Sequence, residues 1–359
     1  MLTGMQAVRR RPGMYVGDTE DGSGMHHLLW EVVGNSVDEH LAGETSFLRV
    51  TFHDDGATVS VEDDGRGIPM DPLPHDPAMT TLEAVMTQLH AGSASWRATH
   101  VHVGRHMWGL GVAVVTGLSS RLEVEICRDG RRHVQEYAAG VALGPVRDLG
   151  PTDRTGTRIT FTPDFSILRR RPWDRAFIAR RLREIAATSP RLTTILDHRA
   201  FRCPAGLADL VRFLGRGQRS LHSEPIQLRG TRDDIGVEAA LLWTAGRRTR
   251  RRHFVGHAHA ARGTHVQGFG RGLFQAFRAL DPARFGTVNR RAFDEVLEPG
   301  LMAAIHVTLE HPRFGSPRRD QLTSPEVLPA VAAVVSEQLA ARLRDDRPLR
   351  EALLARMPG

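Results

Sequence analysis

The spacing of apolar residues predicts a mixture of helices and antiparallel strands in the first 200 residues. Residues 28–41, LLWEVVGNSVDEHL, have apolar side chains at helical spacing, and residues 80–90 repeat that pattern. Residues 47–65 alternate around Asp55-Gly56 and residues 122–137 around Asp129-Gly130, which predicts two β-hairpins. A strand is expected at 156–163. Because the order lacks a regular strand–helix–strand repeat, we expect an α+β fold with a two-layer sandwich.

The pattern restarts near residue 205. Residues 235–243 and 300–310 read as strands, 312–323 as a loop, and 326–346 as a closing helix. A chain of 359 residues is long enough for two cores. We therefore predict one domain at 1–205 and a second at 206–359.

Three polar side chains interrupt the apolar helix at 28–41. Glu31, Asn35 and Asp38 are spaced i, i+4 and i+7, so they share one narrow face of a helix with 3.6 residues per turn. Taken alone, this face is most simply a solvated surface. A carboxylate and an amide one turn apart would also suit a general base beside a metal ligand.

Two glycine-containing segments add candidate chemistry. In VEDDGRGIP, Asp63 ends a strand and Gly65 and Gly67 follow, a pattern that fits either a tight turn or a ligand contact. In GRHMWGLGVAVV, Gly109 and Gly111 precede an apolar helix, and backbone N–H groups at a helix start can bind phosphate.

Charge changes this picture only modestly. The formal net charge is +7, and all 48 basic residues are arginine, because the sequence contains no lysine. That balance suits a polyanion such as nucleic acid, but a lysine-free coding bias would produce it equally well.

The sequence has no apolar run long enough to span a membrane and no signal peptide, so we expect a cytoplasmic location. Cys127 and Cys203 have no metal-ligand spacing and read as core thiols.

Together the motifs identify a family. The ordered segments RRRPGMYVGD, EVVGNSVDEHLAG, VEDDGRGIP, LEAVMTQLHAG, GLGVAVV, GTRITFTP, RGTHVQGF and SPRRDQLTSPEV resemble the N-terminal ATPase and transducer domains of DNA gyrase B and of its topoisomerase IV counterpart. The resemblance implies the GHKL (Bergerat) ATP-binding fold, a two-layer α/β sandwich. It further implies a ribosomal-protein-S5-like α/β transducer domain after it.

The resemblance also implies roles for individual residues. Glu31 would be the general base, Asn35 the Mg²⁺ ligand, and Asp63 the acceptor for the adenine amine of ATP. The other residues implied at the nucleotide are Asp38, Arg66, Gly67, Pro69, Gly109, Gly111 and Thr157. Arg319 would replace the family's catalytic lysine near the γ-phosphate.

The sequence departs from the family in three places. Ser93 and Ala94 stand where a glycine and a lysine are usual, and bulky residues precede Gly109 in the phosphate loop. Pro317 replaces a glutamine beside Arg319. The N-terminal arm and the TOPRIM cleavage domain are expected to be absent. A positioned cation contributes strongly to phosphoryl transfer, so we expect slow hydrolysis.

Three hypotheses follow. The first is a slowly hydrolysing gyrase B-type ATPase module that acts on DNA with a gyrase A-like or TOPRIM-bearing chain, with a homodimer allowed and no membrane contact. The second is a regulatory protein that senses ATP without useful turnover, and the third is a DNA-binding clamp.

Two further clusters each allow two interpretations. The run of arginines at 247–252 would contact DNA in the clamp hypothesis or form a solvated turn. The histidines between 253 and 265 fit a metal site or an exposed loop.

Overall fold

The computed structural model describes residues 4–74, 76–89, 111–286, 288–315 and 319–355. The chain divides into two compact units. Unit 1 contains residues 1–186 and 191–202, and unit 2 contains residues 187–190 and 203–359.

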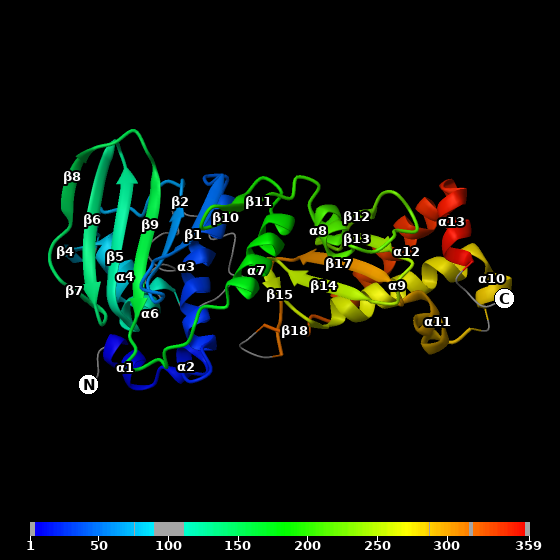
Figure 1. The fold of residues 1–359 in the computed structure, drawn as a ribbon, viewed down its shortest axis with the longest axis horizontal. Helices are drawn as coiled ribbons and strands as arrows, with labels where there is room; N and C mark the ends of the chain where they lie inside the picture. The colour runs from blue at the N-terminus through cyan, green and yellow to red at the C-terminus, as the bar shows by residue number, and fades with distance from the viewer. Residues whose placement is uncertain (1–3, 75, 90–110, 287, 316–318, 356–359) are drawn as a thin grey trace. The chain divides into compact units, whose positions relative to one another are not determined.

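A nine-stranded sheet forms one layer of unit 1 (Figure 1). Its strand order is β11-β10-β1-β2-β9-β5-β6-β7, and β8 also pairs with β6. The strands are β1 Phe47–Phe52, β2 Val59–Asp63, β5 Ser119–Arg128, β6 Arg131–Ala138, β7 Val141–Ala142, β8 Arg147–Pro151, β9 Gly156–Pro163, β10 Thr193–Leu196 and β11 Arg199–Phe201. A separate pair consists of β3 Pro72–Leu73 and β4 Asp76–Thr80. Both predicted hairpins and the predicted strand at 156–163 are confirmed.

Helices form the second layer. They are α1 Gly4–Arg10, α2 Gly13–Val16, α3 Ser23–Leu41, α4 Thr81–Thr87, α6 Val112–Gly117 and α7 Arg175–Thr188. Leu48 and Val50 on β1 and Val61 on β2 are buried beneath this layer, and α3 and α6 pack against each other. Trp30 of α3 meets Phe177 of α7 edge to face, with ring centroids 6.0 Å apart, so α7 belongs to the same layer. The predicted two-layer α+β arrangement is confirmed.

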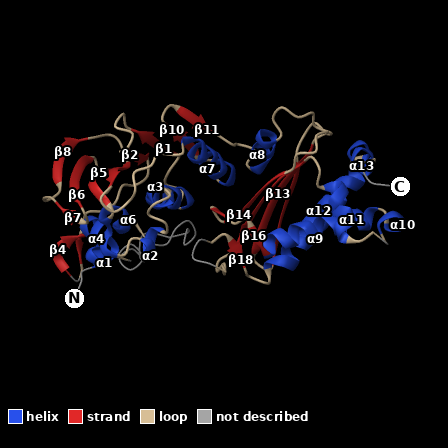
Figure 2. Cartoon of the chain, turned by 60° about the horizontal axis from the view of Figure 1, so that its bottom comes forward, coloured by secondary structure: helices blue, strands red, loops and turns tan. Residues whose placement is uncertain are grey.

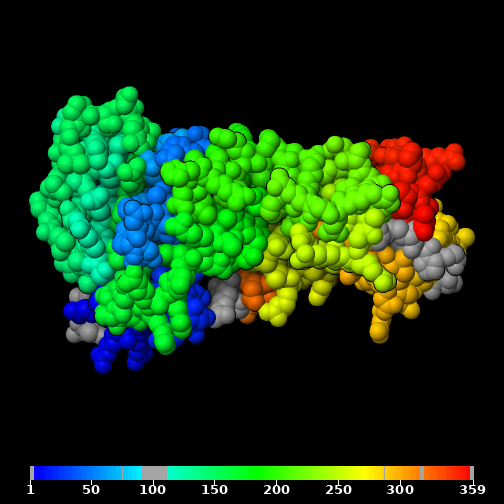
Figure 3. Space-filling model, viewed as in Figure 1, coloured from blue at the N-terminus to red at the C-terminus, as the bar shows by residue number. Residues whose placement is uncertain are grey.

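The outer face of the sheet is polar. Alternate residues of β1, β2 and β9 point away from the helices, and in the space-filling view the cyan and green strands form the surface of unit 1 themselves (Figure 3). Arg49, Glu62 and Arg158 are paired across these three strands by the strand register. One face of β2 therefore carries Glu62 outward, while its neighbour Asp63 points into the helical layer.

Unit 2 is built on a five-stranded sheet of order β12-β13-β17-β14-β15. The strands are β12 Ile226–Arg232, β13 Ile235–Trp243, β14 Arg250–Val255, β15 Ala258–His259 and β17 Leu301–Thr308; β16 Arg262–Gly263 pairs with β18 Gln321–Leu322. The helices are α8 Leu207–Leu214, α9 Thr264–Leu280, α10 Pro282–Phe285, α11 Arg290–Leu297, α12 Val327–Asp345 and α13 Arg347–Leu354.

The core of unit 2 lies between this sheet and two long helices. Figure 2 shows α9 and α12 along one face of the sheet and α8 on the other. Gly268 and Gly272 let α9 approach α12 closely, because a Cβ at Gly272 would lie 2.8 Å from the carbonyl oxygen of Ala332. The predicted strands at 235–243 and 300–310 and the closing helix are confirmed. The predicted loop at 312–323 contains the short strand β18.

No helix among the described residues is both long enough and apolar enough to cross a bilayer. Cys127 and Cys203 are both buried and not disulfide-bonded, as expected.

Candidate functional site

The polar face of α3 places its three predicted residues in different environments. Glu31 is buried, with 3% of its surface exposed, whereas Asn35 one turn later is exposed. The Oδ1 atom of Asp38 is buried and has no hydrogen-bond partner among the described residues. From Glu31 to Asn35 this face thus changes from a buried carboxylate to an exposed amide. That arrangement suits a general base beside a metal ligand that faces solvent.

Two groups engage the Glu31 carboxylate. The backbone N–H of Gly111, immediately before α6, donates to Oε2 at 3.0 Å. The Nε2 atom of His27 lies 3.2 Å from Oε1, one turn earlier on α3. The predicted phosphate loop thus ends beside the predicted base. Gly109, Ser93 and Ala94 lie outside the described residues.

His27 was missed by the sequence interpretation, although a signal existed. His27 and Glu31 are spaced i and i+4, so they share a helix face as surely as Glu31 and Asn35 do. The two side chains form a close contact rather than a hydrogen bond.

Asp38 is kept largely protonated near neutral pH. Burial, followed by the negative charges of Glu39 and Glu31, raises the pKa of Asp38 to about 8. A neutral carboxyl group can donate a hydrogen bond, which an ionised one cannot.

Asp63 is the most heavily hydrogen-bonded carboxylate of the site. Its Oδ1 atom accepts from the backbone N–H groups of Gly65 at 3.1 Å and Thr157 at 3.2 Å, and its Oδ2 atom accepts from the Ser36 hydroxyl at 2.6 Å. Burial raises the pKa of Asp63 to about 6, while these three hydrogen bonds act in the opposite direction. The structure thus brings the predicted pair Asp63 and Thr157 together.

Two glycines make this junction geometrically feasible. Gly156 has a φ of +128°, and a Cβ there would lie 2.0 Å from the carbonyl oxygen of Asp63. Gly67 has a φ of +76°, and a Cβ there would lie 2.9 Å from the carbonyl oxygen of Cys127. Both positions combine a left-handed backbone with close approach, which only glycine tolerates.

Arg66 forms a two-pronged ion pair with Glu39. Its Nε lies 3.1 Å from Oε2 of Glu39 and its terminal nitrogen 3.0 Å from Oε1. This pair ties the turn after β2 to the end of α3, which fixes the chain between Asp63 and Pro69. Pro69 is partly exposed beyond it. Glu39 was also missed by the sequence interpretation.

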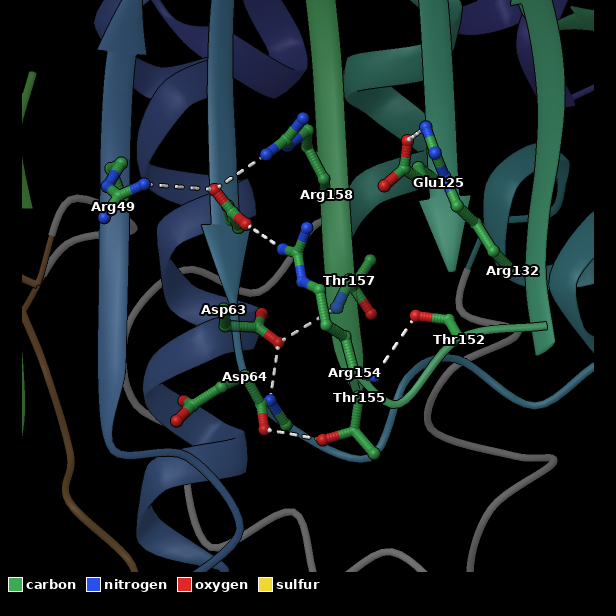
Figure 4. A network of polar contacts seen from close by, with 12 residues as sticks. Arg49, Asp63, Asp64, Glu125, Arg132, Thr152, Arg154, Thr155, Thr157 and Arg158 are labelled. Atoms are coloured by element: carbon green, nitrogen blue, oxygen red, sulfur yellow. Dashed lines mark hydrogen bonds and ion pairs between the residues drawn. The ribbon is translucent and has the colours of Figure 1, made fainter. Parts of the chain in front are cut away.

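A ladder of ion pairs crosses the outer face of the sheet behind this site (Figure 4). Glu62 is buried beneath Arg154 at 2.5 Å, Arg158 at 3.0 Å and Arg49 at 3.7 Å. On neighbouring strands Glu125 pairs with Arg132 at 2.6 Å. These two carboxylates are paired with arginines of the protein, whereas the Oδ1 atom of Asp38 has no hydrogen-bond partner among the described residues.

Arg319 lies in unit 2 between β17 and β18. Its backbone has a φ of +54°, and its guanidinium carbon lies 5.7 Å from the centroid of the Phe314 ring. This is a cation–π arrangement, so the cation is held on an aromatic face. Pro317 lies outside the described residues.

The histidine-rich stretch is not an exposed loop. His253, His257 and His265 are buried, and His253 and His265 have ring centroids 5.9 Å apart. Within the described part of the chain, no group of three His, Cys, Asp or Glu side chains is arranged to hold a metal ion. The exposed-loop interpretation is wrong for these three residues, because β14, the turn after it and the start of α9 carry them into the core, whereas His259 on β15 is exposed.

The arginine run is only partly a solvated turn. Arg250 and Arg251 belong to β14, where Arg250 donates to the Leu214 carbonyl at 2.7 Å and Arg251 pairs with Glu298 at 2.7 Å. Arg247 and Arg248 belong to the preceding turn, where both are exposed.

Comparisons with known proteins agree with this geometry. Residues 20–167 match the family of histidine kinase-, DNA gyrase B- and HSP90-like ATPases, and residues 206–357 match the DNA gyrase B family. The 43K ATPase domain of Thermus thermophilus gyrase B, solved in complex with an aminocoumarin, is 30% identical with a TM-score of 0.78. The similarity covers 99% of this chain and 96% of that domain. The chain belongs to the DNA gyrase B family.

Full-length relatives extend beyond the matched region. The gyrase B protein of Myxococcus xanthus is 34% identical over 99% of this chain and 44% of its own length. That of Thermotoga maritima is 36% identical over 94% of this chain and 55% of its own length. The chain therefore spans about half the length of these gyrase B relatives. Its fold is the GHKL ATPase sandwich followed by a gyrase B-type second unit.

Proposed function

We propose that this chain is a gyrase B-type module that binds ATP and hydrolyses it slowly. The observation that carries this proposal is the junction of α3 with β2. One helix presents Glu31 and Asn35 a single turn apart, and the same helix contacts Asp63 through Ser36. The proposed base and metal ligand thus lie on one helix that also contacts the proposed nucleobase acceptor, and membership of the gyrase B family supports ATP as their common substrate.

Asp63 would accept the exocyclic amine of adenine. Its three hydrogen bonds come from N–H and O–H donors inside the protein, so its remaining lone pairs call for another donor. Thr157 lies beside it, and Gly67, Arg66 and Pro69 form the turn that would line the opening of the base pocket.

Glu31 would take the proton from the attacking water. The Gly111 N–H donates to its carboxylate and orients it, which favours proton transfer along a fixed direction, and His27 lies 3.2 Å from its other oxygen. Asp38, largely protonated near neutral pH, would not act as the base.

Asn35 fits a Mg²⁺ ion that is held jointly with phosphates. The ion prefers oxygen ligands and is commonly bound by one or two protein side chains together with substrate phosphates. The exposed amide of Asn35 offers one such oxygen. When bound, the ion would neutralise phosphate charge.

The expected slow turnover follows from the cation and the phosphate loop. Arg319 is proposed to approach the γ-phosphate, but its planar guanidinium cannot replace an ammonium atom for atom. Gly109 and Gly111 are proposed to line the phosphates, with the Gly111 N–H donating to Glu31 in this structure.

The proposed partners follow from the names of the relatives, each a DNA gyrase B protein. We propose DNA as the macromolecule on which the module acts, together with a gyrase A-like or TOPRIM-bearing chain and, on ATP binding, a second copy of this chain. A cytoplasmic location is proposed on the same basis. DNA binding through arginine should weaken steeply as salt is added.

The deciding experiment compares Mg²⁺-dependent ATP hydrolysis by the wild type and Glu31→Gln, with ATP binding followed by calorimetry. Loss of the base should lower the turnover rate by about 10²–10⁴-fold and leave the ATP affinity within a few fold. Glu125→Gln is the matched control, because Glu125 is a buried carboxylate on the outer face of the sheet. Equal turnover in Glu31→Gln and wild type would refute the role of Glu31. Binding without turnover in either protein would make ATP a signal rather than a fuel.

A further inference from the structure

Ser36 contacts the proposed nucleobase acceptor from inside the protein. It lies on α3 with 2% of its surface exposed. Its hydroxyl donates to Oδ2 of Asp63 at 2.6 Å, at the short end of O–H···O distances. The residues assigned to the nucleotide from the family resemblance do not include it.

All three protein contacts of Asp63 favour the ionised carboxylate. Backbone N–H groups of Gly65 and Thr157 can only donate, so they fix Oδ1 as an acceptor. Ser36 does the same for Oδ2. Burial and the charge of Glu39 act the other way, and the pKa of Asp63 rises to about 6. The ionisation of Asp63 near neutral pH thus depends on a balance to which Ser36 contributes the shortest hydrogen bond.

We propose that Ser36 determines nucleobase specificity by holding Asp63 as an acceptor-only group. The inference rests on the proposed function, because it presumes that a purine nucleotide enters this pocket. Adenine offers a 6-amino donor to Asp63 and is accepted. Guanine and hypoxanthine offer a 6-oxo acceptor, whose lone pairs would face those of the carboxylate.

The physical basis is the penalty for an unmatched buried polar pair. A site built around one hydrogen bond rejects an analogue that lacks the matching group much more strongly than an apolar pocket does. A protonated Asp63 would instead donate to a 6-oxo group. Removing the Ser36 hydroxyl shifts Asp63 towards that protonated form and frees its side chain to rotate. The preference for adenine over a 6-oxo purine should therefore decrease.

The test measures the affinities of ATP and inosine triphosphate for the full chain by calorimetry at pH 8 and pH 6. The wild type should prefer ATP by at least about 100-fold at pH 8. Ser36→Ala should weaken ATP by about 5–10-fold, leave inosine triphosphate unchanged or tighter, and so narrow the ratio by at least about 5-fold. In both proteins the ratio itself should be smaller at pH 6, where more Asp63 is protonated.

The matched control is Ser60→Ala. Ser60 is buried on β2, but its hydroxyl bonds to Thr160 at 2.8 Å and lies 2.7 Å from the His53 ring on the outer face. This variant should keep the wild-type ratio of ATP affinity to inosine triphosphate affinity. Ser36→Cys, whose thiol is a weak donor, should give an intermediate ratio and serves if Ser36→Ala folds poorly.

A second readout is independent of nucleotide. The carboxyl carbon of Asp63, titrated by NMR without ligand, should show a higher pKa in Ser36→Ala than in the wild type. Equal pKa values, or an unchanged ratio of affinities, would overturn the inference, as would equal weakening of both nucleotides. Absence of ATP binding by the wild type would instead refute the proposed function. In that case the proposed function and the specificity inference would fail together.

Discussion

The α3–β2 junction of unit 1 and the histidine cluster of unit 2 both bury titratable side chains, but in opposite ways. In unit 1 burial raises the pKa values of Asp38 and Asp63. The Oδ1 atom of Asp38 has no hydrogen-bond partner among the described residues, and Asp63 accepts three hydrogen bonds. In unit 2 burial lowers the pKa of His253 to about 3 and those of His265 and His306 to about 4, so these rings are neutral packing groups. Burial of a titratable group therefore does not identify a site by itself. The difference lies in whether ordered hydrogen-bond donors converge on a carboxylate, as they do on Asp63.

The largest expected effect is acid destabilisation of unit 2. The folded histidines have pKa values below their ordinary value near 6.5, so the unfolded chain binds more protons as the pH falls through 6.5 towards 4. Stability is therefore lost on acidification, with a slope of up to about 4 kcal/mol per pH unit for three groups. Hydrogen exchange in β14 and β17 between pH 7 and pH 5 would measure it.

His306→Leu tests the cause. It removes one titrating ring and should reduce the pH slope by about a third. Replacement of the exposed His311 by glutamine should leave the slope unchanged. A slope that is insensitive to His306→Leu would show that the cluster is not its source.

The second prediction concerns Asp63→Asn. The amide keeps the shape but turns an acceptor into a partial donor, so ATP affinity should fall by about 100-fold, equivalent to nearly 3 kcal/mol. His265→Asn, in the contrasting cluster, should leave ATP affinity unchanged. Calorimetric titration of both variants decides between a ligand-binding and a purely structural role for each buried group. Wild-type affinity in Asp63→Asn would contradict the base-pocket assignment.

Much of this contrast could be predicted from the sequence. Helical periodicity alone places Glu31, Asn35 and Asp38 on one face, and the strand pattern places Asp63 at the end of β2. The partners Ser36, His27 and Glu39 were not predicted. The Ser36–Asp63 and Glu39–Arg66 contacts each join residues 27 positions apart, so they depend on how α3 packs on β2 rather than on local pattern.

The buried histidines were missed for a related reason. The stretch before His253 is rich in arginine and reads as solvated, yet β14 is an inner strand whose last three residues, His253 to Val255, are all buried. Strand position within a sheet is set by long-range pairing, here the parallel register of β14 with β17. Local polarity could not reveal it.

The third prediction is that Asp38→Asn stabilises unit 1 at alkaline pH. Because the folded pKa of about 8 is above the ordinary value, the folded state binds more protons between about pH 4 and pH 8, and stability falls as the pH rises through that interval. Removing the carboxyl should therefore add about 2 kcal/mol at pH 8.5 and little at pH 4. Urea unfolding at both pH values measures the difference. An equal effect at both would contradict the linkage.

The smallest effect is expected for Glu62→Gln, on the same strand as Asp63 but facing outward. Glu62 is paired with Arg154 and Arg158, which are partly exposed, so solvent screening should hold the loss of stability to about 1 kcal/mol. The loss should shrink further in about 1 M salt, where charges are screened within a few ångströms. ATP affinity should not change. Adjacent residues of β2 would then separate two uses of a buried carboxylate: Glu62 contributes stability without ATP binding, and Asp63 contributes ATP binding. A loss of ATP affinity in Glu62→Gln would show that the two faces of the strand are coupled.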